Sequence, residues 1–197
     1  MLQSEANIAN MALGRLGIRN WVGDMDDDTP EAQTASVFYD SSRDIVLRTY
    51  NWPFARRRAF LALLPITRDG WGGCYALPGD CLAPRMIWGG TRNPSSSLVI
   101  PWTVENNGST SMLLTDQENP LLIYTAQIST VGLYPPAFAE AVAAKLALDM
   151  AFPITGRMEV RVEMLREFRE AISAAITEAS ETEEPDTPPD SEFITGR

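Results

Sequence analysis

The sequence has no histidine, a single lysine (Lys145) and only two cysteines (Cys74 and Cys81) in 197 residues. The missing imidazole removes the commonest general base, the usual activator of a nucleophile and the commonest ligand of transition metals. Two thiolates cannot complete a tetrahedral zinc site alone, although carboxylates or a neighbouring chain could add ligands. Two cysteines are also too few for a disulfide scaffold. We therefore expect no enzyme activity, no metal, no cofactor, and two reduced structural thiols formed in a cytosol.

The sequence also lacks an excess of positive charge and a long hydrophobic run. It has 26 acidic and 16 basic residues, a formal net charge of −10 and a pI near 4.5. Proteins that grip nucleic-acid phosphates carry basic faces, so the charge balance argues against that class. No stretch of about 18 uncharged apolar residues is present, and residues 1–10 lack the basic and apolar regions of a signal peptide. We expect a soluble protein, made inside the cell and without membrane contact.

Two helices are predicted near the N-terminus. Ser4 can cap the first, and Gly17 followed by Ile18 is typical of its C-terminal stop. Thr29-Pro30-Glu31 combines a capping hydroxyl, a proline in the first turn and an acid at the positive helix end, and so starts the second. That helix should run to about Thr49, before Asn51-Trp52-Pro53. Its inner side is expected to carry Ala35, Phe38, Ser42, Ile45 and Arg48 or Thr49.

The pattern changes between residues 57 and 134. Short apolar runs alternate there with clusters of turn-forming residues, which is typical of a small β insertion. The turn clusters are Arg68 to Gly73, Gly89 to Ser97, Asn106 to Ser111 and Asp116 to Pro120. The predicted strands are Ala59 to Leu64, Leu98 to Thr103, Met112 to Leu114 and Leu121 to Ile128.

Helical spacing returns after Pro135-Pro136. A third helix, expected to end at Pro153, has few charged residues and is predicted to be buried on most faces. Its ladder of inner residues is Phe138, Val142, Leu146 and Met150. A fourth helix follows Gly156, with alternating Arg and Glu on its outer side. Its inner residues are predicted to be Met158, Val162, Leu165, Phe168 or Arg169, Ile172 and Ile176.

These patterns predict an α+β fold that is mainly α. Residues 1–56 and 135–180 form a helical bundle, and residues 57–134 form an inserted small antiparallel β-sheet or barrel domain. Residues 181–197 form an extended acidic C-terminal tail that cannot fold alone. The tail ends with the apolar residues Phe193 and Ile194. They favour docking on a partner protein, with a frayed terminus as the alternative.

Three patterns resemble metal-binding or phosphate-binding sites, and each has a simpler interpretation. The acidic loop from Asp24 to Asp28 fails the EF-hand pattern, because its sixth and twelfth positions hold Thr29 and Ala35. The triplet Arg56-Arg57-Arg58 is expected to pair with acids of the same or a neighbouring subunit, with phosphate binding and plain solvation as alternatives. The glycines around Trp71 and at Gly89-Gly90 lack the strand, helix and lysine of a phosphate loop.

Three segments together resemble one family. They are Trp52-Pro53-Phe54-Ala55 with Arg56 and Arg57, the stretch from Tyr75 to Leu82 (Tyr-Ala-Leu-Pro-Gly-Asp-Cys-Leu), and Tyr124 through Pro136-Ala137-Phe138 to Ala151-Phe152-Pro153-Ile154-Thr155. In order and spacing this resembles the head-to-tail adaptor (tail tubular protein A) family of podoviruses, over roughly residues 4–180. In that family an arginine usually follows the Asp-Cys-Leu stretch at once, whereas here Ala83 and Pro84 precede Arg85.

The resemblance implies a virion structural protein in the tail or neck, made in the host cytoplasm. It implies a ring of identical subunits, usually twelvefold, that binds the portal protein above and the tail nozzle protein below. Genomic DNA would pass through the ring without sequence-specific binding, since an acidic wall repels phosphate. The expected interface residues are Phe193, Ile194, Arg56, Arg57, Arg58 and Trp52. The alternatives are a non-viral helical protein–protein interaction module and, third, a hydrolase that uses paired carboxylates.

Overall fold

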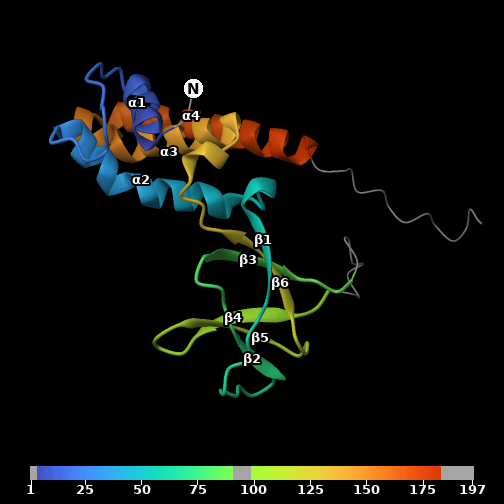
Figure 1. Cartoon of the computed structure of the whole chain (residues 1–197). Coiled ribbons are helices and arrows are strands. Elements are labelled where there is room, and N and C mark those ends of the chain that lie inside the picture. The colour runs from blue at the N-terminus through green and yellow to red at the C-terminus, as the bar shows by residue number, and fades with distance from the viewer. Residues whose placement is uncertain (1–3, 91–98, 183–197) are drawn as a thin grey trace, which may run out of the picture.

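The computed structural model describes residues 4–90 and 99–182, a mixed α/β structure in which helices flank the strands along the chain. The helices are α1 (Glu5–Arg15), α2 (Pro30–Thr49), α3 (Pro136–Thr155) and α4 (Met158–Glu181), with short 3-10 turns at Pro53–Ala55 and Val131–Leu133. The strands are β1 (Arg56–Phe60), β2 (Gly73–Ala76), β3 (Cys81–Ile87), β4 (Trp102–Asn106), β5 (Ser111–Thr115) and β6 (Leu121–Ala126). Figure 1 shows the helices gathered at one end of the molecule and the strands at the other.

The predicted helix starts and stops near the N-terminus are confirmed. The Ser4 hydroxyl accepts a hydrogen bond from the Asn7 N–H at 3.1 Å, and the Thr29 hydroxyl accepts one from the Ala32 N–H at 3.2 Å. Gly17 has a φ of 73°, and the Ile18 N–H donates to the Leu13 carbonyl at 3.0 Å. Local capping chemistry therefore sets these ends.

The predicted inner side of α2 is wrong in part. Ala35 and Ser42 are buried as expected, but Phe38 is half-buried and Ile45 is 43% exposed. Arg43 lies inside instead, where Asp40 and Asp44 pair with its guanidinium, and Ser42 donates to Asp149. Polar groups can be buried where they have hydrogen-bond or ion-pair partners, so the pattern of hydrophobic residues alone did not predict which side of α2 lies inside. The residues of α2 that are buried are Ala32, Ala35, Tyr39, Ser42, Arg43, Val46 and Leu47.

Helix α3 is the central element, because α1, α2 and α4 all pack on it. The predicted ladder is confirmed: Phe138, Val142, Leu146 and Met150 are at most 1% exposed. The predicted stop at Pro153 is wrong, since the helix continues to Thr155. A proline removes only one donor from the helix, and the stop comes at Gly156, whose φ is 63° and whose N–H donates to the Phe152 carbonyl at 2.9 Å.

The predicted inner side of α4 is wrong at its N-terminal end. Met158, Val162 and Leu165 are exposed, by 51%, 63% and 36%. Phe168, Ile172 and Ile176 do pack against the core, as expected. The buried residues are Met164 and Ala175. The line of contact with α3 therefore passes through residues beside the predicted ones in the first turns.

The strands form two three-stranded antiparallel sheets, with the orders β1-β6-β3 and β2-β5-β4. The sequence predicted β1, β4, β5 and β6 with shifted ends, and β1 begins at Arg56, inside the range assigned to the bundle. Strands β2 and β3 were not predicted. Strand β3 contains Pro84 and two register shifts against β6, so its residues do not alternate regularly between polar and apolar.

Candidate interaction surfaces

A hydrogen-bonded trio links β1 and β6 to the loop that precedes β3. Asp80, just before β3, accepts from Arg57 Nη1 at 2.5 Å and from the Tyr124 hydroxyl at 3.0 Å. Its backbone carbonyl accepts from the Gln127 N–H at 2.8 Å. Burial, with the neighbouring Asp80 carboxylate, raises the pKa of Tyr124 to about 12, so its hydroxyl remains a donor near neutral pH. The trio therefore connects β1, the loop before β3, and β6.

Arg85 holds the C-terminal end of α2 against β3. Its Nη2 donates to the carbonyls of Tyr50 at 2.7 Å and Arg48 at 3.0 Å, and its Nε donates to the Thr125 hydroxyl at 2.8 Å. The last carbonyls of a helix have no partners within the helix, and a cation there also suits the helix dipole. This role of Arg85 was not predicted from the sequence. The arginine that follows the Asp-Cys-Leu stretch was the available signal.

The three arginines of the triplet already have partners in their own chain. Arg57 pairs with Asp80, Arg56 donates to the Asn51 side-chain and backbone oxygens at 3.3 and 3.1 Å, and the Arg58 guanidinium lies 5.3 Å from the Trp88 ring centroid. Arg57 and Arg58 remain exposed on β1. The structure therefore accounts for their local contacts, and contact with another subunit stays a prediction.

Trp52 is corrected from an interface residue to a core residue. Its side chain is only 1% exposed, and its indole N–H donates to the Val46 carbonyl at 2.9 Å. Its ring lies edge-on to the rings of Phe138 and Tyr50, with ring centroids 5.0 and 5.4 Å apart. It therefore fixes the end of α2 on α3 and is not available to a partner.

An apolar cavity of about 120 Å³ lies beside Trp52. Phe54, Phe138, Ala175 and Ala179 form much of its wall, while Glu178 and Thr182 also border it. Its size suits one apolar side chain. Phe193 and Ile194, the predicted docking residues of the tail, lie outside the described residues, so the structure does not place them.

The N-terminal part of α4 presents a second apolar surface. Met158, Val162 and Leu165 follow one another at helical spacing and are all exposed, and Phe152 near the end of α3 is 48% exposed. We call Met158, Val162 and Leu165 the α4 apolar strip. Exposed apolar residues that share one face of a helix are typical of protein–protein contacts.

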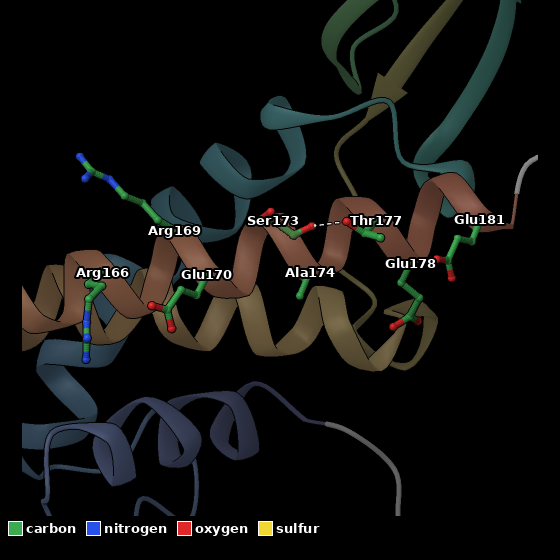
Figure 2. A pocket seen from close by; sticks show the side chains of 8 residues that line it. All are labelled: Arg166, Arg169, Glu170, Ser173, Ala174, Thr177, Glu178 and Glu181. Atoms are coloured by element: carbon green, nitrogen blue, oxygen red, sulfur yellow. Dashed lines mark hydrogen bonds between the residues drawn. The ribbon is translucent and has the colours of Figure 1, made fainter.

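The remaining outer face of α4 is charged (Figure 2). Arg166, Arg169 and Glu170 lie toward one end and Glu178 and Glu181 toward the other, with the small residues Ser173, Ala174 and Thr177 between them. Arg166 also pairs with Glu163. Such a face is compatible with solvent and with a charged partner.

The acidic loop uses its carboxylates to hold its own backbone. Asp27 accepts from the Gly23 and Asp24 N–H groups at 2.8 and 2.9 Å, and Asp24 accepts from the Asp26 N–H at 3.1 Å. Among the described residues no group of acids and cysteines is arranged to hold a metal ion. In the same part of the chain, no helix has the length and apolarity needed to cross a membrane.

No protein-family model and no curated protein matches this chain.

Proposed function

We propose that this chain is a head-to-tail adaptor of a tailed bacteriophage, which assembles as a ring between the portal and the tail nozzle. The observation that carries the proposal is that the three segments of the resemblance meet in space. Arg57, Asp80 and Tyr124 come one from each segment and form the trio described above. Trp52 of the first segment packs on Phe138 of the third. Residues far apart in sequence are thus brought together, by the trio in the β1-β6-β3 sheet and by Trp52 beyond the end of α2.

The arrangement also supports the finer fold proposal, a helical bundle with an inserted β domain. The β strands lie in sequence between α2 and α3, and Arg85 ties them to the bundle by donating from β3 to the carbonyls at the end of α2. A rigid junction suits an adaptor, because helices and strands can then contact different partners in a fixed geometry. The α4 apolar strip is a suitable contact surface within the ring or with the portal.

The direct experiment images the purified chain by negative stain, and weighs it by mass photometry, alone and mixed with the portal protein of the same phage. Closed rings, or a chain–portal complex with ring symmetry, support the proposal. The variant Val162→Glu/Leu165→Glu should weaken that assembly, whereas Glu159→Gln on the same helix should not. A monomer that ignores the portal in low and moderate salt would contradict the proposal and favour the interaction module.

A further inference from the structure

The residues on the charged outer face of α4 are arranged symmetrically about the middle of that face. Arg166 and Glu181 are equally far from the midpoint between Ser173 and Ala174, and so are Arg169 and Glu178. Glu170 and Thr177 form the third such pair. All of these side chains are exposed, and Figure 2 shows them along the helix, arginines toward one end and Glu178 and Glu181 toward the other. Reversing the direction of this helix therefore exchanges its positive and negative ends.

We propose that a second copy of this chain packs antiparallel on this face, with its two-fold axis at Ser173 and Ala174. Arg166 and Arg169 of each copy then lie near Glu181 and Glu178 of the other. The middle of the face carries Ser173, Ala174 and Thr177, whose small side chains let two helices approach closely, and the two-fold axis places Glu170 of each copy opposite the small Thr177 of the other. The Thr177 hydroxyl already donates to the Ser173 carbonyl at 3.0 Å, so it needs no partner across the crossing.

Three of the four end charges are available for such a partner, and the fourth, Arg166, pairs with Glu163 of its own helix. Arg169, Glu178 and Glu181 form no ion pair with any residue in the described ranges 4–90 and 99–182, and the opposite side of α4 is packed on α3. A glutamate in the last turn is also unfavourable for the helix by itself, because the dipole there is negative. A partner's arginines remove that disadvantage.

A two-fold pair is closed, because each copy presents the same patch to the other. Such a pair cannot by itself extend into a ring, so the dimer is a form of the free protein and does not depend on the adaptor proposal. It would occupy the outer face of α4 but leave exposed surfaces on the strands. Ring formation without a dimer, or a dimer without rings, would separate the two proposals.

The test is a charge exchange, read by sedimentation equilibrium of the full chain between about 1 and 100 µM, a range in which interfaces of modest size dissociate. Glu178→Arg/Glu181→Arg makes both ends of the face positive and leaves Glu170 as its one acid, and Arg166→Glu/Arg169→Glu makes all its charges negative. We expect each variant alone to dimerise at least tenfold more weakly than the parent. Mixed together they should form a heterodimer at least as tight as the parent dimer, and more sensitive to salt.

The control Asp69→Arg/Glu118→Arg changes the net charge by the same amount as Glu178→Arg/Glu181→Arg, at exposed positions of the β part. It should dimerise like the parent. Circular dichroism of each variant checks that α4 persists, which arginines near the helix end favour. A parent that stays monomeric throughout the range in low salt, a dimer unaffected by the exchange, or a mixture that does not form the heterodimer would each overturn the proposal.

Discussion

Arg85 joins β3 and β6 to the end of α2 through several hydrogen bonds from one side chain. Its guanidinium donates to three backbone carbonyls at the end of α2 (Leu47, Arg48 and Tyr50) and to the Thr125 hydroxyl on β6, and no neutral side chain of similar length can replace those donors.

We expect Arg85→Met to lower the free energy of unfolding by about 2–3 kcal/mol, the range for hydrogen bonds to a charged group. Arg68→Met removes a half-exposed pair with Glu105 and should cost less than about 1 kcal/mol. Urea denaturation of both variants measures the difference, and equal losses would show that Arg85 does not support α2.

Buried phenol and thiol groups should make the fold sensitive to alkali. Burial raises the pKa of Tyr134 and, together with nearby Asp80, that of Cys81, to about 12 and about 11. An acid with a raised pKa in the folded state stabilises the fold below its unfolded pKa, and this contribution is lost as pH rises through the folded pKa. Stability should therefore fall between about pH 9 and 12.

Two variants separate the contributions of Cys81 and Tyr134 to the loss of stability in that pH range. Cys81→Ala should flatten the part that begins near pH 9, and Tyr134→Phe the part that begins near pH 10. Tyr134→Phe should also cost about 1 kcal/mol at neutral pH, because its hydroxyl donates to the Ile128 carbonyl at 2.7 Å. The melting temperature of each variant is measured from pH 7 to 12. Parent-like slopes in both variants would contradict the assignment.

Among the elements, α3 has the clearest local stop. Gly156 is left-handed with a φ of 63°, a region that a Cβ disfavours. We expect Gly156→Ala to lower the free energy of unfolding by about 1 kcal/mol.

Gly132→Ala is the matched control, because Gly132 has no atoms within 4 Å of the position of an added Cβ and its φ is not positive. It should be neutral or slightly stabilising. Thermal denaturation compares the two. A larger loss at Gly132 than at Gly156 would show that strain at the α3 stop is not the deciding effect.

Substitutions inside α3 should have large effects on stability, because the three other helices pack on it. Leu146 is fully buried, so Leu146→Asp leaves an unpaired charge in the core at a cost of several kcal/mol, comparable with a total stability of about 5–15 kcal/mol. We expect no folded protein from this variant. Phe152→Asp, at a site that is 48% exposed, should stay soluble and folded. Purification yield and circular dichroism distinguish these outcomes.

The C-terminal segment is predicted to act in assembly and not in folding. Helix α4 runs to Glu181, so the informative truncation follows Thr182, which leaves every described element intact. We expect the truncated chain to melt like the parent but to lose attachment to the portal or nozzle. Phe193→Ala/Ile194→Ala should reproduce the loss, whereas Thr195→Ala should not. Normal attachment by the truncated chain would show that the tail does not dock.

Properties that depend on neighbouring residues in the chain were readable from the sequence. The caps at Ser4 and Thr29, the stop at Gly17 and the apolar ladder of α3 all follow from local hydrogen bonding or from helical spacing, and the structure confirms them. The presence of helices before and after a stretch of strands was likewise predicted, because the period of the pattern changes near Arg57.

Properties that depend on packing between distant segments were decided only by the tertiary structure. Arg43 is buried because Asp40 and Asp44 pair with it, and Met158, Val162 and Leu165 are exposed because α4 meets α3 along a different line. Trp52 lies inside because Phe138, far along the chain, completes its pocket. The Asp80 trio and the Arg85 cap join segments that no local pattern connects, since the trio depends on how β1 and β6 pair and the cap on where β3 brings an arginine to the end of α2.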